Sequence, residues 1–330
     1  MRQNNMQRLR LLRIMQILQE ESDEQHTITL NEMSVRLKPS GISFDRKSLY
    51  YDIQALREIG MDIILTKGNR FGYFWANRSF EIAEIKLLID AIQSSIFLTA
   101  KKSKQLIDKL CRLVSKHDAK ILRRYVFIDG RHKAQNECIY YAIDRLHESI
   151  ANNRMVSFKY FEYTLTKSMR HRRNGQIYTV SPYALHWDGN KYYLIADYPK
   201  HGISHFRVDK ITDIVISDES FASSKRNIDL VSYIHQTFSM YGGDIERVTI
   251  VFDNSLIGSV IDRFGTDIQI NKEPDQHFSI QADVKVSPSF LSWIFQFSGN
   301  AVITEPESVV LQMKRMLEQQ YRHYLLADDS

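Results

Sequence analysis

The sequence contains little cysteine and no long apolar run. Its two cysteines, Cys111 and Cys138, can build neither a disulfide framework nor a four-ligand zinc site, so we expect buried, reduced thiols. The apolar runs fall far short of the roughly 20 residues that span a bilayer. The N-terminal stretch keeps arginines among its apolar residues and lacks a small-residue cleavage site. We therefore predict a cytoplasmic protein with no signal peptide and no membrane contact.

Strings that mark common enzymes are also missing. The sequence has no GxxxxGK[ST], GxGxxG, HExxH or GxSxG. His201 and His205 stand four residues apart, but a glycine-containing turn and a strand are predicted there instead of a helix, so zinc is not expected. Asp188, Asp197 and Asp209 form no metal-nuclease motif. We predict a protein that is not an enzyme, with no catalytic residue, no metal and no cofactor.

Charge is distributed unevenly along the chain. At 330 residues, with 43% hydrophobic and 25% charged residues, the composition is that of a globular protein with two or three domains. The formal net charge is +5, and it divides into +10 for residues 1–220 and −5 for residues 221–330. A positive front part suits a polyanionic partner, because each neutralised phosphate releases counterions.

The first 78 residues show helical periodicity followed by a hairpin pattern. We predict helices over 6–20, after Thr29, and after Asp45, with a stop at Lys38-Pro39-Ser40-Gly41. Two short strands follow, at 63–65 and 71–75, around a polar tip. Three helices followed by a β-hairpin form the winged helix-turn-helix order, which we assign to residues 1–78.

The remaining chain predicts an α+β multidomain fold with three further parts. Residues 79–152 read as a helical connector whose basic face is either a DNA contact or simply solvated. Residues 153–220 read as a small curled sheet or β-barrel, and residues 221–330 as an α+β extension. The barrel strands are expected at 155–160, 176–182, 191–196, 204–208 and 211–216. In the extension, strands are expected at 248–252 and 278–284, and helices at 255–264, 288–297 and 306–325.

The third helix carries the candidate DNA-reading face. Leu49, Ile53 and Leu56 repeat at helical spacing on one side, which leaves cationic, phenolic and amide side chains on the other. Such groups suit base edges and phosphates in the major groove, although a merely solvated surface is the alternative. The predicted DNA-binding residues, with two at the hairpin tip, are Arg46, Lys47, Ser48, Tyr50, Tyr51, Gln54, Lys67 and Arg70.

Two segments resemble known families. The run KSLYYDIQAL at 47–56 with GMDI at 60–63 resembles the recognition helix of DeoR-type winged-helix regulators, which usually have Arg where Lys47 and Tyr51 stand. The runs YTVSPYALHW (178–187), KYYLIA (191–196) and HFRVDKI (205–211) resemble the WYL domain, with Tyr192 in place of the signature Trp. Residues 245–325 are similar to the extension that often follows that domain. The resemblance implies a dimeric regulator of bacterial type whose residues 153–220 form an Sm/SH3-like β-barrel.

The same resemblance implies an effector site on the predicted barrel. WYL domains are implicated in binding nucleotide-type or single-stranded nucleic-acid effectors through basic and aromatic positions. Independently, Arg207 offers a planar fork that fits phosphate, unless it pairs with a structural carboxylate such as Asp209. The aromatic residues of these runs either contact the effector or belong to the core. The basic run at 170–173 either binds a polyanion or is a solvated loop. The predicted effector-binding residues are Tyr193, His205, Arg207, Ser181, Tyr183 and His186.

Taken together, the sequence predicts a homodimeric transcription repressor that binds a double-stranded DNA operator under the control of an effector. Two alternatives remain open. One is an activator that uses the acidic last third of the chain. The other is an accessory single-strand-binding subunit of a defence or repair system.

Overall fold

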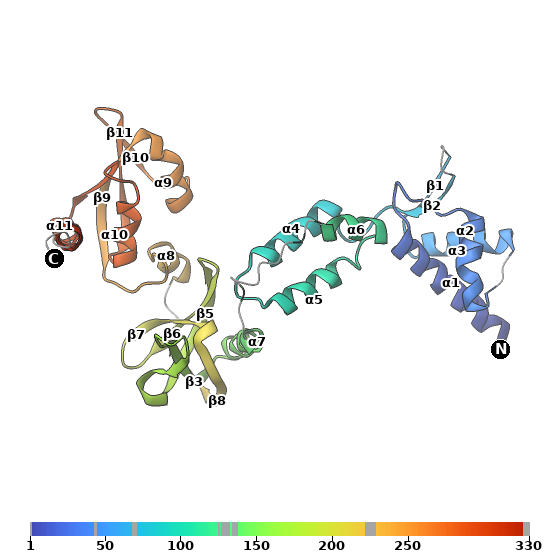
Figure 1. Ribbon diagram of the computed structural model, residues 1–330, viewed down its shortest axis with the longest axis horizontal. Coiled ribbons are helices and arrows are strands. Elements are labelled where there is room, and N and C mark those ends of the chain that lie inside the picture. The colour runs from blue at the N-terminus through green and yellow to red at the C-terminus, as the bar shows by residue number, and fades with distance from the viewer. Residues whose placement is uncertain are drawn as a thin grey trace. The chain divides into compact units, whose positions relative to one another are not determined.

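The computed structural model describes residues 2–42, 45–67, 71–124, 126, 133, 138–221 and 229–325. The chain divides into two units, Met1–Glu137 and Cys138–Ser330 (Figure 1). The fold is mixed α+β, as predicted, with a two-stranded, a six-stranded and a four-stranded sheet. Within the described ranges, no helix is both long and apolar enough to pass through a bilayer.

The first unit begins with the predicted order of three helices and a hairpin, which we call the head. Its elements are α1 (Arg2–Glu21), α2 (Leu30–Leu37), α3 (Arg46–Glu58), β1 (Ile63–Thr66) and β2 (Gly72–Trp75). Thr29 and Glu32 form a reciprocal capping box at the start of α2, and a short 3-10 turn with Gly41 at a φ of 67° ends that helix region. Asp45 caps α3, accepting a hydrogen bond from the Ser48 N–H at 2.8 Å.

The core of the head forms because each helix places its apolar stripe inward. Ile14 and Leu18 of α1, Leu37 of α2, and Leu49 and Ile53 of α3 are all at most 2% exposed and share one cluster. The hairpin closes over this cluster. The chain before α2 joins it through an antiparallel bridge between Ile28 and Tyr73.

A helical connector follows in the same unit. It comprises α4 (Ile82–Ser94), α5 (Ala100–Leu110) and α6 (Lys116–Arg124). α6 lies within the predicted helical connector, but periodicity did not mark it as a separate helix, because only Ala119 and Leu122 of its nine residues are buried. The connector has its own core, in which Cys111 is buried as predicted and burial raises the pKa of its thiol. The side chain of Cys138 lies outside the described residues.

The second unit opens with α7 (Cys138–Ala151), which packs on the six-stranded sheet. The strands run in the order β4-β3-β5-β6-β7, and β8 pairs with β3. The five predicted strands are present and longer than expected, with β4 added. Their bounds are β3 (Arg154–Tyr163), β4 (Met169–His171), β5 (Ile177–Asp188), β6 (Lys191–Tyr198), β7 (Gly202–Arg207) and β8 (Ile211–Ser220).

This sheet is curled but not closed. Within residues 138–221, β7 pairs with β6 and β8 pairs with β3, and no ladder joins β7 to β8. The predicted Sm/SH3-like barrel is therefore not confirmed. A 3-10 turn at Val208–Lys210 separates the two strands. The inner face is aromatic: Phe206 packs on Phe158 with ring centroids 5.1 Å apart and on Tyr178 at 5.7 Å.

The last part of the chain has a β-α-β-β-α-β order with a four-stranded sheet β10-β11-β9-β12, which is the ferredoxin-like arrangement. Both predicted strands and all three predicted helices are present. Sequence reasoning missed α8, and also β10 and β12 because they carry few buried side chains. The bounds are α8 (Leu230–His235), β9 (Ile245–Asp253), α9 (Ile257–Phe264), β10 (Ile270–Glu273), β11 (His277–Lys285), α10 (Pro288–Phe295), β12 (Ala301–Glu305) and α11 (Glu307–Leu325).

Candidate nucleic-acid interface and sensor face

The outward face of α3 is exposed. Tyr51 is 66% and Tyr50 is 45% exposed, and Lys47 and Gln54 are exposed as well. The opposite face of the same helix holds Leu49, which is fully buried. The pattern follows from the three- and four-residue spacing of the apolar positions, which leaves no room for polar side chains inside. Arg46 is exposed at the first turn, where the positive end of the helix dipole favours an anion.

The outward residues of α3 differ in the contacts that they make with the rest of the protein. Ser48 is half-buried and committed to the cap, because its N–H and its hydroxyl both bond to Asp45 at 2.8 Å. Tyr50 contacts Tyr73 of the hairpin. Burial, and then the neighbouring Tyr50 side chain, raise the pKa of Tyr73. Gln54 donates to Glu58 at 3.4 Å, a long and weak hydrogen bond that a ligand could replace.

Two arginines hold α3 in place. Arg10 of α1 reaches Asp52 on α3 with both forks, Nε at 2.5 Å and Nη2 at 3.2 Å. Arg57 at the end of α3 donates to the Ile63 carbonyl oxygen from Nε at 2.8 Å and from Nη2 at 2.6 Å. Such two-point bonds fix orientation as well as distance. The exposed face of α3 is therefore presented by a rigid frame.

The hairpin tip is only partly described. Lys67 is exposed at the end of β1, where a cation could reach a flanking phosphate. Arg70, the second predicted tip residue, lies outside the described residues.

In the second unit, three predicted effector residues form one row across three strands. In the register of the sheet, His186 on β5 faces Tyr193 on β6, which faces Arg207 on β7. Opposed residues of antiparallel strands point to the same face, and here it is the face opposite the aromatic core. All three side chains are half-buried. We call these three residues the sensor row.

Arg207 in the sensor row pairs with a carboxylate of its own chain. Its Nε lies 3.0 Å from Asp209 Oδ1 and its Nη2 lies 2.6 Å from Oδ2, and this bonding raises the pKa of Arg207. The Tyr160 hydroxyl also accepts a hydrogen bond from the backbone N–H of Arg207 at 3.1 Å. The ion pair uses two of the five N–H donors of the guanidinium, so the others can still bind a ligand.

His205 lies on the same face but is engaged on both ring nitrogens. Its Nδ1 donates to the Met240 carbonyl oxygen at 2.7 Å, so its Nε2 accepts from the Tyr233 hydroxyl at 2.9 Å. Burial lowers the pKa of His205 to about 4, so the ring is neutral near pH 7. In this structure His205 ties the six-stranded sheet to α8.

Two further predicted residues lie apart from the sensor row. Ser181 is half-buried and faces Asp197 in the sheet register. Tyr183 is buried at a bulge in β5, with its ring 6.2 Å from that of Phe221.

Of the basic residues around Arg207, sequence reasoning singled out Arg172, within the run 170–173, but not Lys191 or Lys210. Burial and then the charges of Arg207, Arg172 and Lys191 lower the pKa of Lys210, so these four cations lie near one another. Glu162 offsets the charge of Arg172, with which it pairs at 3.6 Å, so Lys191 and Lys210 carry the remaining positive charge of the cluster beyond the Arg207–Asp209 pair. Across the described ranges, no group of three His, Cys, Asp or Glu side chains could hold a metal ion.

Comparisons with known proteins identify two domains. The WYL domain matches residues 141–216, and the WCX domain matches residues 244–321. Among solved structures, the chain is similar to the proteasome accessory factor B/C (PafBC) of Arthrobacter aurescens, with 16% identity and a TM-score of 0.29 over 94% of this chain. It covers 48% of that protein, so it spans about half of that length. No match was found among curated proteins.

A second similar structure is described as a CRISPR Cas-related protein, with 13% identity and a TM-score of 0.38, covering 89% of this chain and 78% of that one. The domain content is that of a DNA-binding regulator in general. The chain contains a WYL domain followed by a WCX domain, which is the domain content of WYL-domain transcriptional regulators.

Proposed function

We propose that this protein is a homodimeric repressor that binds a double-stranded operator through a winged helix-turn-helix at residues 1–78. Its operator affinity would be set by a nucleotide or single-stranded nucleic-acid effector on the WYL domain. The observation that carries the proposal is the exposed face of α3, with Lys47, Tyr51 and Gln54 directed away from the core.

The chemistry of that face supports operator reading. Lysine donates to guanine or to phosphate, the glutamine amide can pair with adenine, and tyrosine hydroxyls bond phosphate. Asp52 is neutralised by Arg10, so its carboxylate does not repel the DNA backbone as a free charge would. A two-fold dimer would place two such helices in major grooves about one helical turn, or a multiple of it, apart.

The sensor row supports effector control. Tyr193 supplies an aromatic ring on which a base can stack, and Arg207 supplies the remaining donors for a phosphate. Asp209 already binds the Arg207 guanidinium, so an effector phosphate has to bind Arg207 more strongly than Asp209 does. The neighbouring cations favour replacement of Asp209 by the phosphate. Allostery requires that the effector bind one dimer geometry better than the other.

Genome-wide DNA selection with the purified chain tests the proposal. The double variant Lys47→Ala, Gln54→Ala is compared with Lys104→Ala, Gln105→Ala, which removes the same two residue types from an exposed part of α5. We expect the first variant to lose operator preference by about 10-fold or more, because each specific base contact contributes about 1–3 kcal/mol. Preserved preference in the first variant would contradict the assignment of α3.

A further inference from the structure

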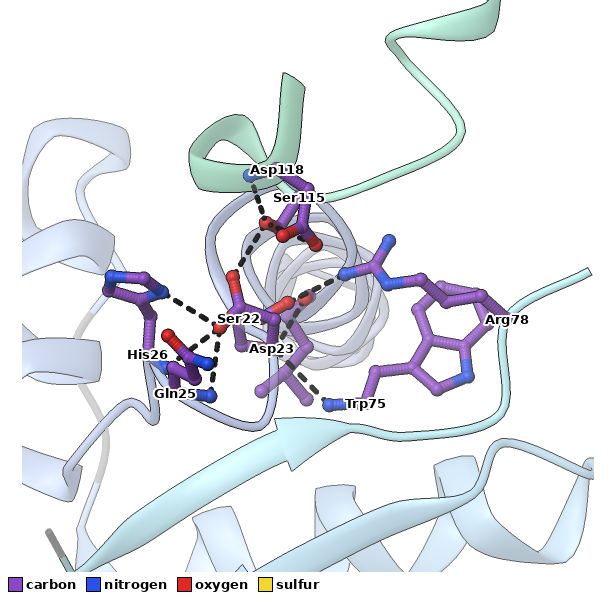
Figure 2. Close-up of polar contacts among 9 residues, drawn as sticks. Ser22, Asp23, Gln25, His26, Trp75, Arg78, Ser115 and Asp118 are labelled. Carbon is purple, nitrogen blue, oxygen red and sulfur yellow. Dashed lines mark hydrogen bonds and ion pairs between the residues drawn. The ribbon is translucent and has the colours of Figure 1, made fainter. Parts of the chain in front are cut away.

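The head and the connector have separate apolar cores. The head core centres on Leu18, Leu49 and Ile53, and the connector core on Ile89 and Ile107, with no shared residue. Between the two cores lie polar side chains from the end of α1, the end of β2 and the start of α6 (Figure 2). Polar contacts have discrete made and broken states, whereas a shared apolar core would fuse the two parts.

Asp23, just after α1, is the hub of these contacts. Its Oδ1 accepts from the backbone N–H groups of Gln25 at 3.0 Å and His26 at 2.8 Å, and also from His26 Nδ1 at 2.8 Å. Its Oδ2 accepts from the Ser115 hydroxyl at 2.6 Å. Ser115 in turn accepts from the Asp118 N–H at 3.0 Å and so caps α6. One carboxylate thus orders the loop of the head and anchors the first turn of α6.

Arg78, beyond β2, makes a second connection. Its Nη2 donates to the Ser22 carbonyl oxygen at 2.6 Å, and its guanidinium lies 5.7 Å from the Trp75 ring centroid. Its Nη1 reaches the Leu113 carbonyl oxygen in the connector at 3.4 Å. Figure 2 shows Arg78 directed toward Ser22 and Asp118. Burial lowers the pKa of Arg78, and the nearby Asp118 and Asp23 charges oppose that change.

Two further contacts surround the hub. Lys116 of α6 and Arg36 of α2 both bind the carboxylate of Glu21, which therefore bridges the two parts. The rings of His26 and His117 stack in parallel, with centroids 3.7 Å apart and planes at 3°. The groups that face His117 are therefore His26 and Asp23 from the head and Lys116 and Asp118 from its own helix.

We propose that these contacts form a latch between head and connector that opens and closes while both apolar cores stay folded. We define the latch by Glu21, Ser22, Asp23, His26, Arg78, Ser115, Lys116, His117 and Asp118. When closed, it fixes the orientation of α3 relative to α4–α6. When open, it lets the head reorient. The latch lies at Trp75, the end of the hairpin away from its tip, so it does not occupy the proposed DNA-reading face.

The latch responds to protons through His117. Burial, and then the neighbouring His26, lower the pKa of His117, so the closed latch favours the neutral ring. Closure is therefore fully favoured above the ordinary histidine pKa and weakens as the pH falls through it toward the lowered value. Burial and then Asp23 raise the pKa of Asp118, which acts in the opposite direction at lower pH.

The latch is tested by the distance distribution between spin labels on the full chain, carried by ketone side chains at Val35 of α2 and Gln105 of α5. Both positions are exposed, and both cysteines stay in place. In Asp23→Ala the open fraction is expected to rise roughly 10-fold or more, because charge-assisted hydrogen bonds are lost. The control Asp90→Ala removes an exposed carboxylate of α4 and is expected to leave the distribution unchanged.

Hydrogen exchange on the same samples separates latch opening from unfolding. The proposal expects the amides of α3 to keep their protection in Asp23→Ala. Unchanged distances in both Asp23→Ala and Arg78→Ala would overturn the latch. So would simultaneous loss of protection throughout the head in both variants, since the contacts would then belong to one cooperative core.

A pH series provides a readout that a merely structural role would not move. Between about pH 8 and pH 5.5, a window that brackets the ordinary histidine pKa, the wild-type chain is expected to gain open fraction. His117→Phe keeps a ring for stacking but carries no proton, so it is expected to stay closed across the window. Identical pH responses in the two chains would contradict the proton dependence.

A role of the latch in DNA recognition depends on the proposed function, in which the head binds an operator. On a selected operator, the closed wild-type latch should reject half-sites moved apart by one or two base pairs, an estimate from the rise of DNA. Asp23→Ala should tolerate them. If the labels report opening while spacing tolerance is unchanged, the latch stands and its role in operator choice fails. If no operator exists, only the proposed function fails.

Discussion

At the scale of single residues, close backbone approaches and buried charges set limits that no periodicity reveals. Arg10 and Asp52 are an example. In the sequence each resembles an ordinary surface charge, but in the structure their ion pair holds α3 against α1. The exposure of Lys47 and Gln54 followed from helical spacing alone. The commitment of His205 to Tyr233 and Met240 did not, because its partners lie 28 and 35 residues away. Long-range pairing is invisible to local pattern.

Gly243 is predicted to be intolerant of any side chain. A Cβ built there would lie 2.2 Å from the Val286 carbonyl oxygen, a distance that forces the backbone apart. Gly243→Ala should destabilise the C-terminal α+β part of the chain by about 2 kcal/mol or more, measured by chemical denaturation. Its neighbour provides the control, because a Cβ at Gly242 meets nothing within 4 Å. Equal effects of the two substitutions would show that the close approach is not limiting.

Lys285 is predicted to make stability depend on alkaline pH. It is 5% exposed, its Nζ lies 3.1 Å from the Tyr233 ring centroid, and burial lowers its pKa to about 8. Between that value and the ordinary lysine pKa, the unfolded chain binds more protons than the folded one. Stability should therefore rise with pH in this window, by at most about 1.4 kcal/mol per pH unit.

Lys285→Met removes this dependence, so its free energy of unfolding should exceed that of the wild-type chain most at neutral pH. The gap should shrink as the pH approaches 10, near the ordinary lysine pKa of about 10.4. Parallel pH profiles for the two chains would show that Lys285 is not the group responsible.

At the scale of elements, caps and strong apolar stripes were predictable and weakly buried elements were not. The N-caps Thr29 and Asp45 and the buried face of α3 were expected from the sequence and are present. By contrast, all four residues of β10 are exposed, so the strand exists through its ladder with β11 alone. The sensor row could be placed on one face from strand alternation, but its exact neighbours depend on a register that includes a bulge in β5.

The capping box of α2 gives an element-scale prediction. The Thr29 hydroxyl accepts from the Glu32 N–H at 3.2 Å, and the Glu32 carboxylate accepts from the Thr29 N–H at 2.8 Å. Thr29→Ala should cost the head about 1 kcal/mol of stability, measured by thermal or chemical unfolding. Thr29→Ser keeps the hydroxyl and should recover most of the loss. Failure of Ser to recover it would assign the effect to the lost methyl group.

At the scale of the whole molecule, the proposed function requires a head that reads DNA and a WYL domain that senses an effector in the same chain. The WYL domain was recognisable from three sequence runs in order and its C-terminal extension from residues 245–325, and the WYL and WCX matches confirm both. The sheet does not close into a barrel through β7 and β8. Closure could not be predicted, because strand number and alternation do not determine whether the last two strands form a ladder. The latch was also not predictable, since its members come from three separated stretches of chain.

The most direct test of effector control is the operator affinity of the full chain, measured during titration with nucleotides and single-stranded oligonucleotides. We predict that an effector changes this affinity in the wild-type chain, and that Arg207→Ala loses the change while still binding the operator. Arg247→Ala is the matched control, because Arg247 also holds a carboxylate with both forks, Asp283 at 2.8 and 3.1 Å, but on the WCX sheet. An Arg207→Ala chain that responds as fully as the Arg247→Ala chain would contradict the account.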